Sequence, residues 1–284
     1  MSHQGDLRSG FVTLVGRPNV GKSTLLNRLC GTKVSIVSDK PQTTRRAVHG
    51  VLHRAGVQVV FVDTPGIGKP RTALGTRLNA TATGALGDVD VACLVVDATR
   101  RFGPGDRFVA DRLPATGVVV VNKIDAASPA RVLEQLARVS EVPAEAYFPL
   151  SARTGEGLEA FEEHLLGRMP PGPPYYPEGM VSALADEVVV AELVREQLLA
   201  LMREELPYAI ATRVTEWDWP RIRCEILVER ESQRRIVIGH RGSVLKHVGT
   251  EVRRQLPPGA YLDLHVAVDP NWQDRPGAVE RYCS

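Results

Sequence analysis

The sequence predicts a doubly wound α/β domain followed by a smaller α+β domain. From residue 11 to about residue 168, strand-like apolar runs alternate with amphipathic helical stretches. A proline-rich segment then interrupts this alternation, and a different order of helices and strands follows it. The 284 residues, 43% of them hydrophobic, suffice for two compact cores. We therefore divide the chain into a tail (1–9), an α/β domain (10–168), a linker (169–184) and an α+β domain (185–284).

The first strand-like run, 11–15, leads into a glycine-rich loop and then into an apolar helical pattern. Glycines let successive backbone N–H groups turn toward one anion, and the start of a helix adds a favourable dipole. We expect Lys22 to reach between the β- and γ-phosphates of a nucleotide and Ser23 to bind Mg²⁺. The predicted phosphate-binding residues are Gly16, Arg17, Pro18, Asn19, Val20, Gly21, Lys22, Ser23 and Thr24.

The second site segment ends the apolar run 57–62. A carboxylate at the carboxyl edge of a strand can hold Mg²⁺ through water, and a glycine N–H after it can meet a γ-phosphate. We therefore expect Asp63 to serve the metal and Gly66 to contact the phosphate. The residues predicted here are Asp63, Thr64, Pro65, Gly66 and Ile67.

A third apolar run, 118–121, ends in the segment that identifies the base. The Asp125 carboxylate can accept hydrogen bonds from the N1–H and the exocyclic amine of guanine, whereas adenine offers no such pair of donors. A fourth run, 148–150, precedes a loop whose backbone N–H can contact the guanine O6. These segments predict GTP and GDP as ligands of Asn122, Lys123, Ile124, Asp125, Ser151, Ala152 and Arg153.

Each of these four strings, taken singly, also fits an ordinary turn at the end of a strand. Their order and their placement after four β-like runs distinguish them from chance matches. In a doubly wound sheet the ligand binds at the carboxyl ends of the strands, where all four segments fall. The fold prediction and the site prediction therefore agree.

The composition excludes several other classes of protein. No stretch approaches the about 18 apolar residues that a membrane span requires. Residues 1–9 lack the apolar core of a secretory signal, so we expect no export. The 4 cysteines are scattered without a CxxC pair, which argues against a zinc site or a disulfide framework and favours a reducing cytoplasm. Because the net charge is only +2, attraction to nucleic acid requires a local basic patch.

The segment between the two domains is rich in proline. Prolines remove backbone donors and disfavour helix in the residues before them, which predicts a stiff linker over 169–184. A ligand for an SH3-type domain is the alternative interpretation. The position of the segment between two structured patterns favours the linker.

The second domain has its own order of predicted elements. Apolar residues at helical spacing predict a long helix that stops before Pro207. Two alternating stretches flank Asp218-Trp219-Pro220 and predict a hairpin. The full order is a helix at 185–206, strands at 208–217 and 221–228, a short helix at 236–238, a Gly239–Gly242 loop, a helix at 244–256 and a strand at 261–268. This is the order of a KH module of the second topological type.

The GxxG tetrapeptide lets two helices meet closely enough to grip the backbone of a single-stranded nucleic acid. Basic residues concentrate around it, with seven against two acids between Arg230 and Arg254, although residues 185–284 carry 14 basic and 16 acidic groups. A common turn beside a solvated basic helix face is the alternative, but the order of elements favours RNA binding. The predicted RNA-binding residues are Arg234, Arg235, Gly239, His240, Arg241, Gly242 and Lys246.

The chain resembles the Era GTPases, which are bacterial proteins with a Ras-like P-loop GTPase domain and a type II KH domain. The resemblance covers nearly the whole chain. The segments on which this resemblance rests are GRPNVGKSTLLN from Gly16, KPQTTR ending at Arg45, DTPG, NKID, SAR, PPYYPE, EELPYA and IVIGHRG. It implies binding to the 3′ region of 16S ribosomal RNA, a part in assembling the 30S subunit, and in some members loose attachment to the inner membrane. We expect a cytoplasmic monomer, with peripheral membrane attachment as an added possibility.

The resemblance also completes the predicted catalytic group. The TTR pattern of relatives selects Thr44 rather than Thr43 as a ligand of Mg²⁺ beside Ser23. Ras-like enzymes often carry glutamine after DxxG, but Ile67 stands there and can orient no water. In related GTPases with this replacement a P-loop asparagine helps to bind K⁺, which suggests that role for Asn19, with an ordinary turn residue as the alternative. The predicted catalytic residues are Asn19, Lys22, Thr44 and Gly66, with slow turnover stimulated by K⁺.

The GxxG loop departs from the usual pattern of the family at one position. Relatives often carry lysine and glycine inside this loop, whereas here His240 stands there and Arg241 is the main cation of the loop.

We expect the small residues of 32–46 and 66–84 to order around a γ-phosphate and to link the nucleotide to RNA binding. The rival functions are a GTP-binding scaffold with hardly any turnover, and a GTPase that acts on tRNA or membranes.

Overall fold

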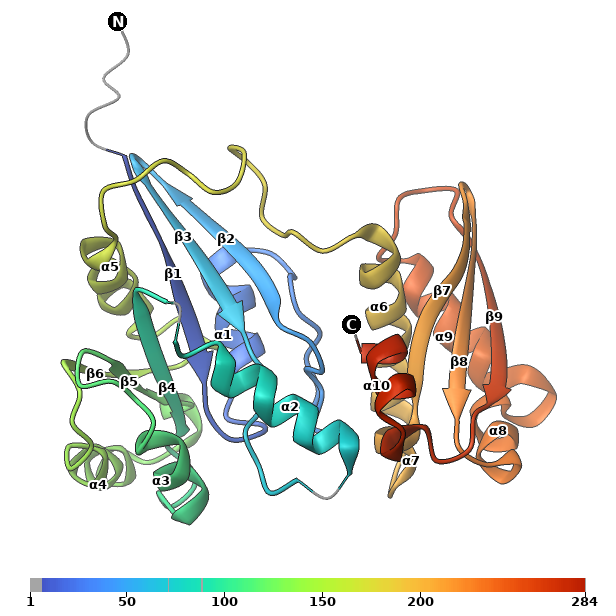
Figure 1. Cartoon of the computed structure of the whole chain (residues 1–284), viewed down its shortest axis with the longest axis horizontal. Helices are drawn as coiled ribbons and strands as arrows, with labels where there is room; N and C mark the ends of the chain where they lie inside the picture. The colour runs from blue at the N-terminus through green and yellow to red at the C-terminus, as the bar shows by residue number, and fades with distance from the viewer. Residues whose placement is uncertain (1–6, 71, 88, 284) are drawn as a thin grey trace, which may run out of the picture. The chain divides into compact units, whose positions relative to one another are not determined.

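A computed structural model describes residues 7–70, 72–87 and 89–283 (Figure 1). Most of the predicted tail, residues 1–6, therefore lies outside the described residues. The chain forms two compact units, the first made of 1–37, 44–69 and 77–183 and the second of 38–43, 70–76 and 184–284. The predicted linker groups largely with the first unit, while the predicted domain boundaries remain predictions.

The first unit contains a six-stranded sheet in the order β2-β3-β1-β4-β5-β6. All neighbouring pairs are parallel except β2 and β3, which form an antiparallel pair at one edge. The central strands are valine-rich and buried on both faces, as expected for a sheet covered by helices. The strands are β1 (Arg8–Val15), β2 (Val48–Arg54), β3 (Val57–Asp63), β4 (Val91–Asp97), β5 (Val118–Asn122) and β6 (Ala146–Leu150).

Helices cover this sheet and fix the loops between the strands. Alternate residues of β4 and β5 share a core with Ala82, Val109 and Val139, one from each of three helices. The others, α1 and α5, contact β3. The helices are α1 (Lys22–Cys30), α2 (Ala73–Gly84), α3 (Pro104–Ala110), η1 (Ile124–Ala126), α4 (Pro129–Val139) and α5 (Leu158–Arg168). Residues 73–84 of the segment 66–84 are helical, and the ordering of that segment around a γ-phosphate stays a prediction.

The proline-rich segment is bound to the sheet of the first unit. The buried Gln58 side chain accepts hydrogen bonds from the N–H groups of Tyr175 and Tyr176 and donates one to the Tyr176 carbonyl. Further along, the Val51 N–H donates to the Val181 carbonyl at 3.0 Å. Proline cannot supply such donors, so the prolines of the linker serve through their carbonyls, as where Pro170 and Pro173 accept hydrogen bonds from Ser9.

The second unit has a three-stranded sheet, β7-β8-β9, with an antiparallel and a parallel pair. The predicted helix 185–206 ends at Leu201 because Met202 turns to an extended backbone, and a separate turn of helix begins at Leu206. Sequence analysis also missed the last helix, whose neighbour Trp272 is fully buried and donates to the Ala209 carbonyl. The elements are α6 (Asp186–Leu201), α7 (Leu206–Ala209), β7 (Ala211–Asp218), β8 (Arg221–Val228), α8 (Glu231–Ile238), η2 (His240–Gly242), α9 (Ser243–Arg253), β9 (Tyr261–Val268), η3 (Trp272–Asp274) and α10 (Pro276–Cys283).

The core of the second unit lies between this sheet and α6, α8 and α9. Ile222, Cys224, Ile226 and Val228 occupy every second position of β8 and are fully buried in that core. Within 7–70, 72–87 and 89–283, no helix is long and apolar enough to cross a bilayer.

Candidate functional sites

The four predicted nucleotide-binding segments follow four different strands of one sheet. The glycine loop lies between β1 and α1, DTPG begins at the last residue of β3, NKID begins at the last residue of β5, and SAR follows β6. Neighbours within the set β3-β1-β4-β5-β6 run parallel, so these strands end at the same edge. The sheet therefore brings together segments that are up to about 130 residues apart in the chain.

Lys22 begins α1 and is turned back into the glycine loop. Its Nζ donates to the carbonyls of Gly16 and Arg17, each at 3.2 Å, and the residue is 6% exposed. Burial lowers the pKa of Lys22 to about 8, although the nearby Asp63 carboxylate acts in the opposite direction. An anion bound in the loop would favour the charged form of Lys22. It would also replace the two carbonyls as the hydrogen-bond partner of the Lys22 ammonium.

Three hydroxyl groups converge on the Asp63 carboxylate. Its Oδ2 accepts hydrogen bonds from Ser23 (2.6 Å), Ser35 (3.1 Å) and Thr44 (3.3 Å), and the Ser23 and Thr44 hydroxyls lie 3.0 Å apart. Burial raises the pKa of Asp63, and Lys22 and the three hydroxyls oppose that rise. The Thr43 hydroxyl instead donates to the Lys40 carbonyl. Of the two threonines, Thr44 is thus the one placed beside Ser23.

This oxygen cluster fits a magnesium ion. Hydroxyl and carboxylate oxygens are the ligands that Mg²⁺ prefers, and it retains several of its waters. The Oδ1 atom of Asp63 is buried and has no hydrogen-bond partner within the described residues. A buried carboxylate oxygen left without a donor is costly, and a water bound to a metal would supply one.

The base-binding end of the site is a cavity of about 350 Å³. Asp125 on its wall accepts a hydrogen bond from the Ser151 hydroxyl at 2.5 Å and forms an ion pair with Arg153. The Ser151 hydrogen bond is the main reason that the pKa of Asp125 is lowered, and Arg153 adds to it. Arg153 is 76% exposed, so a guanine can displace it from the carboxylate. The cavity is lined by Gly21, Thr24, Val37, Asn122, Lys123, Asp125, Ala126, Ala152 and Arg153.

Asn122 links the phosphate end of the site to the base end. Its amide donates to the Val20 carbonyl at 2.9 Å, and its carbonyl oxygen accepts from the Ala152 N–H at 3.0 Å. Gly21 has φ 99°, and a Cβ there would lie 2.3 Å from the Asn122 amide nitrogen. Glycine is therefore required at this position by both conformation and space. Lys123 adds a second link by donating to the Asn19 carbonyl and pairing with Asp97.

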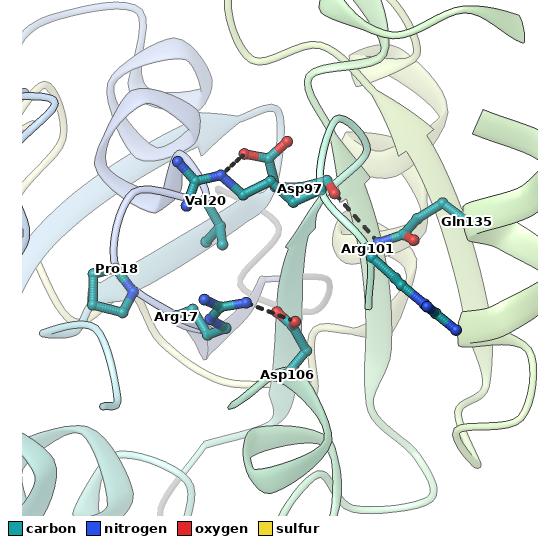
Figure 2. Close-up of a pocket in the computed structure, with 8 residues that line it drawn as sticks. Arg17, Pro18, Val20, Asp97, Arg101, Asp106 and Gln135 are labelled. Carbon is teal, nitrogen blue, oxygen red and sulfur yellow. Dashed lines mark hydrogen bonds and ion pairs between the residues drawn. The ribbon is translucent and has the colours of Figure 1, made fainter. Parts of the chain in front are cut away.

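The outer side of the glycine loop is held by α3. Figure 2 shows the Arg17 guanidinium pointing toward Asp106, and the two groups form an ion pair at 3.1 Å. Asp106 also accepts a hydrogen bond from the Gly103 N–H at the start of its own helix. On the same side, Gln135 donates to the Asp97 carbonyl (Figure 2). The loop is thus supported from outside the nucleotide site as well as from within.

Several predicted site residues contribute only their backbone or support the fold. The side chains of Ile67 and, in part, Ile124 pack in the core beneath the sheet edge, and the Ile67 N–H donates to the Gly16 carbonyl. The Thr64 hydroxyl donates to the Leu14 carbonyl. Gly66 approaches the loop so closely that a Cβ would lie 2.6 Å from the Pro18 nitrogen. Pro65 is buried beside it.

The predicted RNA-binding loop connects α8 and α9. Gly239, Arg241 and Gly242 have φ values of 76°, 49° and 77°. A Cβ on Gly239 would collide with Val244, whereas a Cβ on Gly242 would meet nothing within 4 Å. His240, Arg241 and the nearby side chains of Arg235 and Lys246 are exposed, while Arg234 pairs with Glu231. The loop therefore offers cations and an unobstructed backbone to a ligand.

Sequence reasoning missed three residues at these sites. Ser35 contacts Asp63, and Asn27 holds the backbone of Ser35, yet no spacing rule connects a loop residue to a carboxylate 28 positions later. Ile236 lies on α8 close to the GxxG loop and is 57% exposed. An exposed apolar side chain in a basic region is of the kind on which the bases of single-stranded RNA can pack.

Two family descriptions match the chain. Residues 11–123 match the family described as "50S ribosome-binding GTPase", and residues 205–273 match the KH domain family. The GTPase Era of Mycobacterium sp. (strain JLS) is 44% identical, over 97% of this chain and 98% of that protein. The GTPase Era of Mycolicibacterium smegmatis is 43% identical, over 95% and 97%.

Two solved structures resemble the whole chain. A variant of Aquifex aeolicus Era bound to GDP and AlF4⁻ aligns with a TM-score of 0.90 at 37% identity, covering 97% of this chain and 99% of that one. Era in complex with MgGDPNP and nucleotides 1506–1542 of 16S ribosomal RNA aligns with a TM-score of 0.91 at 37% identity, covering 97% and 98%. With its P-loop GTPase unit and its KH unit, the chain belongs to the Era family of GTPases.

Proposed function

We propose that this protein hydrolyses GTP at the sheet edge described above and binds the 3′ region of 16S ribosomal RNA through its KH domain during assembly of the 30S subunit. Family membership supports the GTPase activity. The solved Era complex with MgGDPNP and a 16S ribosomal RNA fragment supports the nucleotide, the metal and the RNA.

One observation carries the nucleotide part of the proposal. Asp63 gathers the hydroxyls of Ser23 and Thr44, with Lys22 close to the same carboxylate. The side chain of Asn122 ties this phosphate end to the loop before Arg153 at the base end. A single ligand with phosphates and a guanine base fits both ends.

We assign roles to the residues of this site. Lys22 and the backbone N–H groups of 19–23 neutralise and orient the phosphates, and Gly66 donates its N–H to the γ-phosphate. Ser23 and Thr44 would ligate Mg²⁺, with Asp63 holding one of its waters. When bound there, Mg²⁺ would neutralise negative charge on the phosphates. Asn19 would bind K⁺ beside them, because Ile67 supplies no polar group for the attacking water.

Single-turnover hydrolysis tests the enzyme against the scaffold alternative. The full chain should release phosphate from GTP slowly, with a rate constant on the order of 10⁻⁴ to 10⁻² s⁻¹, and faster in K⁺ than in Na⁺. Lys22→Ala should abolish release, whereas Arg112→Ala, at an exposed cation just after α3, should not change it. Release at the same rate from Lys22→Ala would overturn the site, and equal rates in the two salts would remove Asn19 from the mechanism.

Crosslinking followed by sequencing of the bound RNA tests the RNA part. We expect enrichment of the 3′ region of 16S ribosomal RNA and loss of that enrichment in Gly242→Asp. Enrichment of tRNA, or of no RNA, would favour the rival function. Cytoplasmic location, a monomeric state and loose attachment to the inner membrane stay predictions, which cell fractionation, sedimentation and vesicle flotation test.

A further inference from the structure

We propose that Ser35, held in place by Asn27, is a positioning residue of the magnesium site. It is linked to the predicted nucleotide-binding segments through its hydrogen bond to Asp63, and it acts by fixing the orientation of that carboxylate. This role rests on the proposed function, because it presumes that Asp63 serves Mg²⁺.

Asn27 uses every polar atom of its side chain on the segment that carries Ser35. Its Oδ1 accepts from the N–H groups of Val34 and Ser35, both at 2.8 Å, and its Nδ2 donates to the Ser35 carbonyl at 2.7 Å. Asn27 lies four residues after Ser23 on α1, which places both on one face of that helix. The helix that carries a predicted metal ligand therefore also fixes the backbone of Ser35.

The Ser35 side chain connects this fixed segment to the Asp63 carboxylate. Ser35 is 4% exposed, and its hydroxyl donates to Asp63 Oδ2 at 3.1 Å. The hydroxyls of Ser23 and Thr44 donate to the same oxygen. All three donors on one oxygen leave Oδ1 without a partner among the described residues. The carboxylate is thus held in the orientation that presents a free lone pair to a metal-bound water.

Ser35 differs from the other two hydroxyls in what it can do when the metal binds. Ser23 and Thr44 lie within 3.0 Å of each other and face the predicted metal position together, whereas Ser35 approaches Asp63 from the segment clamped by Asn27. We infer that Ser35 keeps its hydrogen bond to Asp63 in both states. A donor that stays constant reduces the reorganisation that metal binding requires.

The Mg²⁺ dependence of nucleotide release measures this role without relying on hydrolysis. The full-length chain is loaded with a fluorescent GDP, and its release rate is followed as Mg²⁺ is added. Since a hydrogen bond to a charged group is lost, Ser35→Ala should raise the Mg²⁺ midpoint on the order of tenfold. Its release rate in excess chelator should match the parent chain. Ser35→Thr keeps the hydroxyl and should restore the midpoint.

Ser9→Ala provides a matched control. Ser9 is 2% exposed and its hydroxyl also donates a hydrogen bond, but to the Pro173 carbonyl in the linker, away from Asp63. An unchanged midpoint in Ser35→Ala, or an equal shift in Ser9→Ala, would overturn the positioning role. If Ser35→Ala shows no cooperative thermal transition, Asn27→Asp replaces it. This variant keeps the acceptor for both N–H groups and loses the donor, so its midpoint should also rise, and an unchanged midpoint overturns the role.

Ser23→Ala separates this inference from the site assignment itself. It should remove the Mg²⁺ effect on release. A Ser23→Ala chain with a normal midpoint would overturn the metal site and the role of Ser35 with it. A normal midpoint in Ser35→Ala beside a defective Ser23→Ala would overturn the role of Ser35 alone.

Discussion

The nucleotide site and the GxxG loop both bind phosphate in our proposal, but they are built in opposite ways. Lys22 and Asp63 are both buried, and the protein supplies hydrogen-bonding partners to the Lys22 ammonium and to Oδ2 of Asp63. Arg241 and His240 are exposed on a turn with left-handed backbone. One site is organised before its ligand arrives, whereas the other is left open to it.

This difference predicts how strongly substitutions and salt affect binding at each site. In a buried site, removing one partner leaves a polar group unsatisfied, so single substitutions have large effects that salt screens little. At an exposed loop each cation contributes a small, salt-dependent share. We therefore expect substitutions at the nucleotide site to cost more affinity than substitutions at the loop.

Asp125→Ala should weaken GTP binding on the order of 10³-fold, because the guanine N1–H and amine lose their shared acceptor. Calorimetry of the nucleotide-free chain measures the affinity. Asp111→Ala, at an exposed carboxylate just after α3, is the matched control and should bind GTP normally. A loss of less than about tenfold would mean that the base end is not organised by this carboxylate.

Gly242→Asp should weaken binding of a single-stranded RNA oligonucleotide on the order of tenfold or more, through repulsion of the RNA backbone. Gly242→Ala separates charge from conformation, since it adds a Cβ in open space at φ 77°. Filter binding at fixed salt compares the two variants. Equal losses in both would show that backbone strain, and not charge, decides the effect. GTP affinity should stay unchanged in either case.

GTP binding should weaken about tenfold between pH 7 and pH 9 as the Lys22 ammonium is lost. In the free site the pKa of Lys22 is about 8, lowered by burial, and bound phosphates raise it again. Binding above that pH therefore takes up a proton, and affinity falls as pH rises. Calorimetry in two buffers of different ionisation enthalpy should show net proton uptake at pH 8.5 that exceeds the uptake at pH 7. No net uptake there would contradict the buried ammonium.

Arg241→Ala should weaken RNA binding only severalfold, with a slope of log affinity against log salt that becomes shallower by about 1. Titrations at several KCl concentrations measure that slope. Lys33→Ala, at an exposed lysine of the first unit, should leave it unchanged. An Arg241→Ala chain with the parent slope would place the RNA backbone elsewhere.

Much of the nucleotide site could be predicted because local sequence specifies it. The order of the apolar runs and their period are enough to predict where the glycine loop lies, between a strand and a helix. They also predict that the acidic and amide residues follow strands. The same holds for the hairpin, the GxxG loop and the helix after it in the KH unit. Element ends were less certain, as the early end of α6 and the unpredicted α10 show.

The order of strands, loops and helices can be read along the chain, and it already implies that the GTP-binding segments meet at one sheet edge. Three contacts become visible only in the folded protein: Ser35 with Asp63, Gln58 with the proline-rich segment, and the Ile67 side chain with the core. Period and turn chemistry act over a few neighbouring residues, whereas the partner of a buried polar group is set by which distant segments pack together, and no local pattern records that.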